Sequence, residues 1–369
     1  MTENRKLIVV GQTPPPYNGQ AKMIQQMING LSDEFDLFHI RMTYSDSVVS
    51  AGKFSFSKIR HLFHLIHTTR RALKENPGAV LYYPPASPNL IPVLRDILYL
   101  LSVRSLAGKT ILHFHSGGVS EFVRCRNWLK PVAMKAYGGP DMAVELGRSC
   151  PRDGEFFDAR NIRVVPNGID MPPVTGNQKS ASGNLRILYV GIHTESKGMF
   201  DLLETARELK QRGVTFEIRT AGLWYTDRER CRFDRMRKEY ELESEVLTLG
   251  QKTGEELQAL YGWANVFFFP TFYPWETFGI VQLEAMASSL PVVASDWQGP
   301  KDIVLNEETG FLCPVHDINA YATALQNLAN DRELGRCLGR AGRRRYEQLY
   351  TANCFIRNMK QVFTDICCL

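Results

Sequence analysis

The chain has 369 residues, a formal net charge of +5 at pH 7, 44% hydrophobic residues and 22% charged residues. This composition is ordinary for a globular protein, and the length predicts two domains with ample core. The small positive charge does not indicate a nucleic-acid-binding protein. It suits anionic small molecules or an anionic membrane surface.

Eight cysteines are scattered without a Cys-x-x-Cys pair, so a zinc site is not expected, and the pattern is typical of reduced thiols in a cytoplasmic protein. The first apolar run, residues 7–10, is too short for the core of a signal peptide and predicts a strand. The most apolar later run, residues 90–106, contains Pro92 and charged residues. It falls short of the roughly 20 apolar residues that span a membrane, so a buried or surface-lying helix is expected there.

Short apolar runs alternate with longer amphipathic ones through the first half of the chain. This pattern is typical of a mostly parallel sheet covered by helices on both faces. The strands expected in this half are residues 7–10, 35–40, 79–83, 110–115, 142–146 and 162–165. The helices expected between them are residues 21–31, 58–75, 90–101 and 121–137.

The alternation restarts after residues 171–184, a stretch rich in Pro, Gly, Ser, Asn and Lys that predicts a linker. The later strands are expected at residues 185–190, 216–220, 246–249, 266–269, 292–294 and 311–313. The later helices are expected at residues 198–212, 254–263 and 279–288, followed by a long helical tail at about 320–366. Two doubly wound domains are therefore predicted, residues 1–170 and residues 185–349, with the helix at about 350–369 packed back on the first.

Ligands of doubly wound sheets bind at the carboxyl ends of the strands, so the cleft between two such domains is the predicted site. Glu276 lies in a loop, residues 271–277, at such a strand end. There its carboxylate can accept hydrogen bonds from sugar hydroxyls. Glu284 lies in the helix that follows and can reach a ribose diol about one turn away. The alternative is that Glu276 is a carboxylate favoured by the helix dipole and that Glu284 is merely solvated.

The residues between these two carboxylates predict an anion site. Phe278, Gly279 and Ile280 lie at the start of the expected 279–288 helix, where backbone amides have no partner within the helix and favour a phosphate. Gly279 also allows the backbone to approach a phosphate closely. A turn is expected afterwards, at residues 296–300.

The run "PTFYPWETFGIVQLEAMASSLPVVASDWQGPKDIVLNEETGFLCPVHD", residues 270–317, resembles the core of the retaining glycosyltransferase family four, which has the GT-B fold. That family carries, in order, a Glu-x7-Glu motif, an "EAMA" helix, a "PVVASD" strand, a Gly-Pro turn and a "TGFL" hairpin, and this chain matches each. The resemblance extends over nearly the whole chain and is weaker in the first half. It implies two Rossmann-like domains facing each other across a cleft, the first binding an acceptor and the second a nucleotide-sugar donor.

A second constellation is Gly191-Ile-His-Thr-Glu-Ser-Lys197-Gly198, which follows a strand and opens a helix. Gly191 permits the turn, and Lys197 places a cation where it can neutralise a diphosphate leaving group. In the family an Arg usually follows the Gly, whereas this chain has Ile192, so one phosphate contact is either missing or supplied by another residue. His193 would replace it in part, although neutral imidazole is a poor substitute for guanidinium. The alternative is an exposed Lys at a helix start.

Three smaller features also fit the resemblance. The loop at residues 13–20, which contains Gly19, resembles the first loop of the family; the alternative is a Pro-rich turn. His115 ends a strand where the family often has a His that points at the transferred sugar; the alternative is a packed histidine. Gly250 and Lys252 follow a strand where the family receives the nucleotide base, and backbone contacts are expected there.

Residues 54–74 predict a basic amphipathic helix. Such helices can lie on anionic membranes, so a peripheral membrane contact is one interpretation. The alternative is an apolar stripe that faces the core and a basic face that is solvated.

The resemblance implies a retaining, metal-independent hexosyltransferase with Glu276, Lys197 and His115 as catalytic residues. The donor would be a nucleotide-diphosphate sugar, UDP-linked as is commonest in the family, and the acceptor a glycan or a lipid-linked glycan in surface polysaccharide biosynthesis. A cytoplasmic protein, at the inner face of the membrane, is expected, without cofactor, metal or nucleic-acid partner. A nucleotide-sugar epimerase of the same fold and a non-catalytic nucleotide-sugar-binding protein stay open, the latter because of Ile192.

Overall fold

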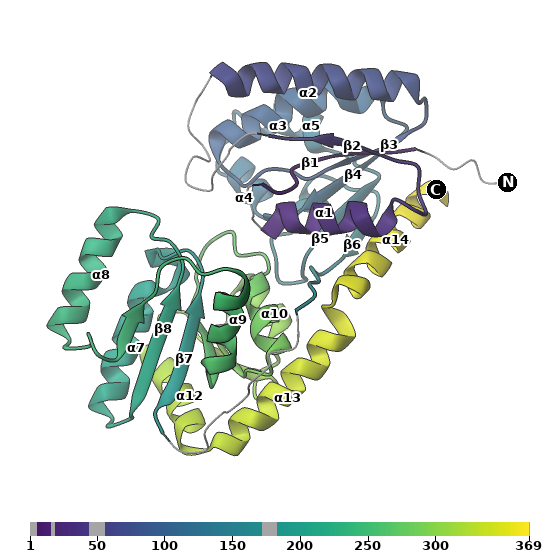
Figure 1. Cartoon of the computed structure of the whole chain (residues 1–369). Coiled ribbons are helices and arrows are strands. Elements are labelled where there is room, and N and C mark those ends of the chain that lie inside the picture. The colour runs from purple at the N-terminus through teal and green to yellow at the C-terminus, as the bar shows by residue number, and fades with distance from the viewer. Residues whose placement is uncertain (1–5, 16–18, 44–55, 172–182, 369) are drawn as a thin grey trace. The chain divides into compact units, whose positions relative to one another are not determined.

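The computed structural model describes residues 6–15, 19–43, 56–171 and 183–368. The chain forms two compact units: unit 1 comprises Met1–Gly168 with Ala352–Leu369, and unit 2 comprises Ile169–Thr351. Each unit holds a six-stranded parallel sheet flanked by helices (Figure 1), so the predicted doubly wound α/β class is confirmed. The linker predicted at residues 171–184 falls almost wholly outside the described residues.

The sheet of unit 1 has the strand order β2-β1-β3-β4-β5-β6, and its neighbouring strands are parallel. Its strands are β1 (Leu7–Gly11), β2 (Leu37–Arg41), β3 (Val80–Tyr83), β4 (Lys109–Phe114), β5 (Met142–Glu145) and β6 (Ile162–Val164). All residues of β1, β3 and β5 are buried, because helices cover both faces of these mostly apolar runs. The six strands expected in this half are confirmed.

Helices α2, α3 and α5 lie on one face of this sheet, and α1 and α14 lie on the other (Figure 1). The helical segments of unit 1 are α1 (Gly19–Leu31), α2 (Phe56–Glu75), α3 (Leu90–Val103), η1 (Arg104–Leu106), α4 (Val119–Arg124), α5 (Lys130–Tyr137), α6 (Asp153–Phe156) and α14 (Ala352–Cys368). The prediction of one helix at residues 121–137 is wrong, because two helices are present. Pro131 favours the new start at α5, since it has no amide N–H to donate.

The sheet of unit 2 has the order β12-β11-β10-β7-β8-β9 and is also parallel. Its strands are β7 (Leu185–Val190), β8 (Phe216–Ala221), β9 (Val246–Thr248), β10 (Val266–Phe269), β11 (Val292–Ser295) and β12 (Gly310–Cys313). The chain winds outward from β7 in one direction and from β10 in the other. The carboxyl ends of β7 and β10 therefore form the switch point at which such sheets bind ligands.

Helices α7 and α8 lie on one face of this sheet, and α9 and α10 on the other (Figure 1). The helical segments of unit 2 are η2 (Glu195–Lys197), α7 (Met199–Gln211), α8 (Asp227–Glu239), α9 (Gly254–Trp263), α10 (Ile280–Ala287), α11 (Gln298–Ile303), α12 (Ile318–Asn330) and α13 (Arg332–Leu349). The sequence does not predict α8, because its buried side chain, Phe233, gives no apolar periodicity. The turn expected at residues 296–300 is wrong in part, because α11 begins at Gln298.

The helical tail expected at residues 320–366 is three helices, α12, α13 and α14. It breaks at Asp331, whose carboxylate accepts a hydrogen bond from the Leu334 amide and caps α13. It breaks again at Tyr350, and α14 then packs against α1 within unit 1. The last helix is therefore part of the first structural unit.

Asp96 on α3 is a wholly buried carboxylate in unit 1. It accepts hydrogen bonds from the Tyr83 hydroxyl at 2.8 Å and from the Ala86 amide at 2.6 Å, and it pairs with Arg95 at 2.8 Å. These contacts tie the segment after β3 to the first half of α3. Removing the carboxylate from such a buried ion pair is strongly destabilising, because the remaining partners stay buried.

Replacing Asp96 by Ala is expected to lower the free energy of unfolding by about 3 kcal/mol, because its partners stay buried without an acceptor. Urea titration of the purified chain measures this loss. Glu75→Ala is the control, since it breaks the exposed Arg71–Glu75 pair in the same unit and should leave stability unchanged. Equal losses in the two variants would contradict the role of Asp96.

Candidate functional site

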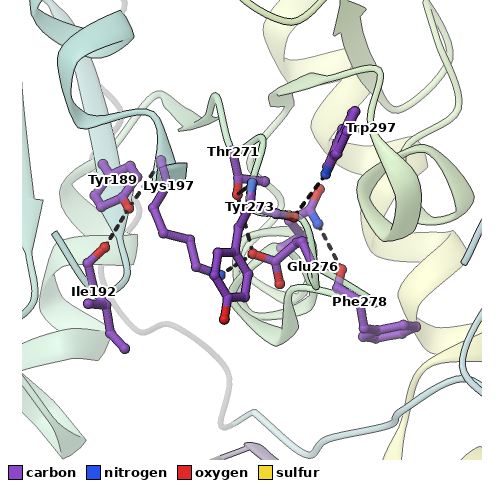
Figure 2. A network of polar contacts seen from close by, with 9 residues as sticks. Tyr189, Ile192, Lys197, Thr271, Tyr273, Glu276, Phe278 and Trp297 are labelled. Atoms are coloured by element: carbon purple, nitrogen blue, oxygen red, sulfur yellow. Dashed lines mark hydrogen bonds and ion pairs between the residues drawn. The ribbon is translucent and has the colours of Figure 1, made fainter. Parts of the chain in front are cut away.

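Lys197 and Glu276 form an ion pair at the switch point of unit 2 (Figure 2). Lys197 ends the loop after β7, and Glu276 lies in the loop after β10. The Lys197 Nζ donates to Glu276 Oε2 and lies 4.6 Å from the centroid of the Tyr273 ring. Both side chains are largely shielded from water, with 19% and 10% of their surfaces exposed. Two residues that the sequence singled out separately are thus brought together.

The Glu276 loop is fixed by its own polar groups. Thr271 Oγ1 lies 3.4 Å from Glu276 Oε2 and accepts a hydrogen bond from the Tyr273 amide at 3.3 Å. The Tyr273 carbonyl accepts hydrogen bonds from the Glu276 amide at 3.0 Å and from the Trp297 indole at 2.9 Å. Sequence reasoning did not single out Thr271, Tyr273 or Trp297. In the sequence, the one indication of a role for these residues is that they follow expected strands, where ligands of such sheets bind.

The Lys197 loop is fixed by Tyr189, the penultimate residue of β7 (Figure 2). The Tyr189 hydroxyl lies 3.1 Å from the Ile192 carbonyl oxygen and 3.3 Å from the Lys197 carbonyl oxygen, so one proton is shared between the two ends of the loop. The Phe272 amide donates to the Ser196 carbonyl at 2.9 Å and joins this loop to that of Glu276. The lysine is therefore held by backbone contacts on both sides.

Gly198 lets the two loops meet. Its φ is +81°, and a Cβ at this position would lie 2.1 Å from the Pro270 carbonyl oxygen. No side chain fits such a contact, and few residues other than glycine adopt this φ. The close approach brings the start of α7 onto the carboxyl end of β10.

Glu229, in the first turn of α8, also holds the Lys197 loop. Its carboxylate accepts hydrogen bonds from the Thr194 hydroxyl at 2.5 Å, the Glu195 amide at 2.9 Å and the Thr226 hydroxyl at 2.7 Å. Burial raises the pKa of Glu229, but these hydrogen bonds, that of Thr194 first, bring it below its usual value overall. The Thr226 hydroxyl in turn accepts from the Glu229 amide at 3.2 Å and caps α8, and the Thr-x-x-Glu spacing typical of a helix start could have been recognised in the sequence.

Ile192 and His193 differ sharply in exposure. Ile192 is 38% exposed, whereas His193 is fully buried and packs edge-on against Trp224 with ring centroids 4.9 Å apart. Neither ring nitrogen of His193 has a hydrogen-bond partner among the described residues, and burial lowers its pKa to about 4. The imidazole is therefore neutral at pH 7 and enclosed. It cannot present a positive charge to a ligand in this arrangement.

The start of α10 contains the three residues expected near an anion. Phe278 is buried, and Gly279, with φ +80°, caps the helix that begins at Ile280. Gly299 of α11 donates its amide to the Glu276 carbonyl at 3.1 Å, and a Cβ on it would lie 2.4 Å from the Phe278 nitrogen. The backbone at this helix start is thus enclosed by α11 as well as by its own loop.

Glu284 is half-buried, one turn into α10, and accepts a hydrogen bond from the Tyr261 hydroxyl at 2.8 Å. Tyr261 on α9 is fully buried, and its pKa is raised well above the usual value by burial first and by the Glu284 charge second. The tyrosine therefore stays protonated and orients the carboxylate. Nothing in the sequence links position 261 to position 284.

The remaining predicted donor residues lie at other strand ends of unit 2. Gly191, with φ +157°, follows β7, and Gly250, with φ +70°, follows β9 and accepts from the Gly222 amide at 2.9 Å. Lys252 pairs with Glu256 at 2.6 Å on the first turn of α9. These residues therefore share the sheet edge at which Lys197 and Glu276 lie.

His115 and Gly19 belong to unit 1. His115 is buried, stacks on His113 with ring centroids 3.8 Å apart and lies 3.3 Å from the Tyr82 hydroxyl, and burial lowers its pKa to about 3. Gly19 is the first residue of α1, and residues 16–18 before it lie outside the described ranges. His115 is thus a neutral, packed histidine at the carboxyl end of β4.

Two glycine substitutions test whether the close contact between Gly198 and Pro270 limits stability. Gly198→Ala is expected to lower the free energy of unfolding by about 3 kcal/mol, through both the contact with Pro270 and the positive φ. Gly213→Ala is the control, because Gly213 has φ +72° with no atom within 4 Å of the added Cβ, so about 1 kcal/mol is expected. Chemical denaturation measures both, and similar losses would show that φ alone decides.

Buried His193 predicts a pH dependence. Because its folded pKa is lowered from the usual 6.5 to about 4, the unfolded chain binds more protons in that window. Its contribution to stability is fully present above pH 6.5 and is lost as the pH falls toward 4, by about 2–3 kcal/mol. His193→Leu should lose less stability over this window than the native chain does, in denaturant titrations. Parallel pH profiles would contradict this.

Residues 175–345 match a family model described as glycosyl transferases group 1. A curated relative is CapM of Staphylococcus aureus, named a capsular polysaccharide biosynthesis glycosyltransferase, which is 27% identical over 185 residues. That match covers 50% of this chain and 47% of CapM, so the chain spans about half the length of the curated relatives it matches.

Solved structures match over both units. Sucrose-phosphate synthase of Thermosynechococcus elongatus gives a TM-score of 0.77 at 20% identity, with 98% of this chain and 99% of that chain covered. HepE of Anabaena, in complex with UDP and glucose, gives 0.71 at 13% identity, with 97% and 99% covered. Identities this low establish the fold alone. The chain therefore has the GT-B fold, and its residues 175–345 are similar to the glycosyl transferases group 1 family.

Proposed function

We propose that this protein is a glycosyltransferase that moves a sugar from a nucleotide-diphosphate sugar to a glycan or lipid-linked glycan. The observation that carries the proposal is the Lys197–Glu276 pair at the switch point of a glycosyl transferases group 1 domain. A shielded cation beside a shielded carboxylate supplies both kinds of group that a sugar diphosphate needs. The cation suits the phosphates, and the carboxylate suits the sugar hydroxyls.

Lys197 would stabilise the charge that develops on the diphosphate as it leaves. Such preorganised electrostatic stabilisation is usually the largest single contribution to catalysis. Glu276 and the Tyr273 ring hold the ammonium group in place. When phosphate oxygens take over the ammonium group, Glu276 becomes available to accept hydrogen bonds from the sugar. The amides of Phe278, Gly279 and Ile280 would add donors for the phosphates.

The proposed reaction retains the configuration of the sugar and needs no metal ion, as in the family that the sequence resembles. The bond between the anomeric carbon and the diphosphate oxygen breaks, and a bond to the acceptor oxygen forms on the same face. The proton of the acceptor hydroxyl passes to an oxygen of the leaving diphosphate. Glu276 and Lys197 would act on the donor side. His115, neutral in unit 1, would contact the transferred sugar.

Glu284, held by Tyr261, would bind the ribose, and Gly191, Gly250 and Lys252 would line the nucleotide end of the site. UDP is the proposed nucleotide, supported by the HepE complex with UDP and glucose. The name of CapM supports an acceptor in capsular or other surface polysaccharide synthesis, and with such an acceptor the protein would act in the cytoplasm at the inner face of the membrane. Gly19 would approach this acceptor or the phosphates.

Position 192 favours one other function, nucleotide-sugar binding without turnover. Ile192 is exposed where the family usually has an Arg, and His193 is enclosed and cannot replace it. The two functions separate in one measurement. Release of UDP from a UDP-sugar that depends on acceptor indicates transfer, whereas binding without release indicates a binding protein.

Lys197→Ala and Glu276→Ala are expected to lower acceptor-dependent UDP release by at least about a hundredfold, because each removes a group that acts on the leaving diphosphate or the sugar. The measurement uses a panel of UDP-sugars with oligosaccharide and lipid-linked acceptors. UDP alone, followed by thermal stabilisation, should bind more weakly to Lys197→Ala than to Glu276→Ala, since only the lysine carries the phosphate contact.

Lys210→Ala is the matched control for these variants. Lys210 lies in the last turn of α7, whose first turn follows Lys197, and it pairs with Glu245 at 3.4 Å. This variant should keep native turnover. Near-native turnover in both site variants would rule out the proposed roles.

A further inference from the structure

The outer face of α3 in unit 1 is entirely aliphatic. Every exposed residue of this helix is a leucine or an isoleucine. These residues are 39–52% exposed, and they are Leu90, Ile91, Leu94, Leu98 and Leu101. At 100° per residue these positions fall within a sector of about 100° around the helix axis. The stripe therefore runs along nearly the full length of the helix.

An outer helix face in a globular protein normally carries polar or charged residues. The two charged residues of α3 do not make its outer face polar, because Asp96 is wholly buried and pairs with Arg95. The opposite side of α3 already provides the core contacts, through Val93, Leu100 and Val103. The exposed stripe is therefore additional apolar surface that the fold of unit 1 does not use.

The two helices that flank α3 are strongly basic. Helix α2 packs on one side of α3 and α5 on the other, and all three lie on the same face of the sheet (Figure 1). Together the three helices contain eight Lys and Arg residues and two Asp and Glu residues, a net charge of +6. The whole chain has a net charge of +5, so these three helices carry a larger net positive charge than the chain as a whole.

The basic side chains are placed at the surface. Arg60, Arg71 and Lys74 on α2 and Lys130 and Lys135 on α5 are exposed. Helix α2 packs Leu62, Leu65 and Leu73 into the core cluster of unit 1, so most of the exposed aliphatic surface of this layer is provided by α3. An aliphatic stripe bordered by cations on both sides is the surface chemistry of proteins that bind anionic lipid.

Two exposed aromatic residues extend the surface. Phe63 on α2 is 59% exposed, and Trp128, in the turn directly before α5, is 65% exposed. Tryptophan is enriched where apolar lipid meets the polar headgroups. None of the helices in the described ranges is both long enough and apolar enough to cross a bilayer. The surface suits a helix lying in the interface.

We propose that α3, flanked by α2 and α5, is a docking surface for an anionic lipid bilayer. The aliphatic stripe enters the headgroup–acyl boundary, and the flanking lysines and arginines contact lipid phosphates. A second copy of the chain fits this surface less well, because a two-fold contact through α3 would bring basic helices of both copies together. The docking does not depend on the proposed sugar transfer, and it would hold unit 1 beside a lipid-linked acceptor.

Co-sedimentation of the full chain with vesicles tests the proposal. The probes are vesicles of phosphatidylcholine alone and of phosphatidylcholine mixed with phosphatidylglycerol. The native chain should bind the anionic vesicles more tightly, and added salt should weaken that binding. The double variant Leu94→Gln, Leu98→Gln should lose about tenfold or more in vesicle affinity, since two apolar side chains no longer leave water. Arg60→Glu with Lys135→Glu should abolish the preference for anionic vesicles.

Matched controls lie in unit 2. Leu349, at the end of α13, is 43% exposed, so Leu349→Gln repeats the leucine change on another surface, and Arg235→Glu repeats the charge change on α8. Both should bind vesicles like the native chain. Thermal stabilisation by UDP should be unchanged in all variants, which shows that unit 2 is intact whether or not vesicles bind.

Two results would overturn the proposal. One is equal vesicle binding by the native chain and the α3 double variant. The other is a native dimer, seen by size-exclusion chromatography with light scattering, that the α3 variant converts to a monomer while neither form binds vesicles. The second result would assign the stripe to an interface between copies of this chain.

Discussion

The reversal of strand order between β7 and β10 is the constraint from which the site of unit 2 follows. Helices leave these two neighbouring strands toward opposite faces of the sheet, and sheets of this kind bind ligands at such a point, at the carboxyl ends of the strands. Lys197 and Glu276, 79 positions apart in the chain, meet there. A shielded ion pair adds little to stability on balance, since desolvation offsets its attraction. The precise packing of Gly198 on Pro270 and the bonds of Tyr189 instead serve to place this pair.

The site relies on geometry rather than on an accumulation of positive charge. Burial keeps His193 neutral, and position 192 carries an isoleucine, so in the proposed site the attraction for a diphosphate would come from Lys197 and backbone amides. Glu229 helps by accepting three hydrogen bonds from the Lys197 loop and its neighbour. Because these hydrogen bonds occupy its oxygens, the Glu229 carboxylate orders the loop without competing with Glu276 for Lys197.

Unit 1 distributes its charge differently. Burial holds His113 and His115 neutral, while the layer formed by α2, α3 and α5 has a net positive charge. The sheet separates this layer from α1 and α14 on the opposite face (Figure 1). One face of unit 1 therefore combines aliphatic and cationic surface. If the acceptor is lipid-linked, this face would bind the membrane that carries it.

The sequence by itself determined the parallel α/β class, the positions of the strands and the similarity of residues 175–345 to glycosyl transferases group 1, because apolar runs and the Glu276–Glu284 motif are local patterns. It did not reveal α8, which lacks apolar periodicity, or the division of the 121–137 helix. Only the tertiary structure paired Lys197 with Glu276 and Tyr261 with Glu284, enclosed His193 and exposed one face of α3. Each of these depends on which distant segments lie side by side, and spacing along the chain carries no such information.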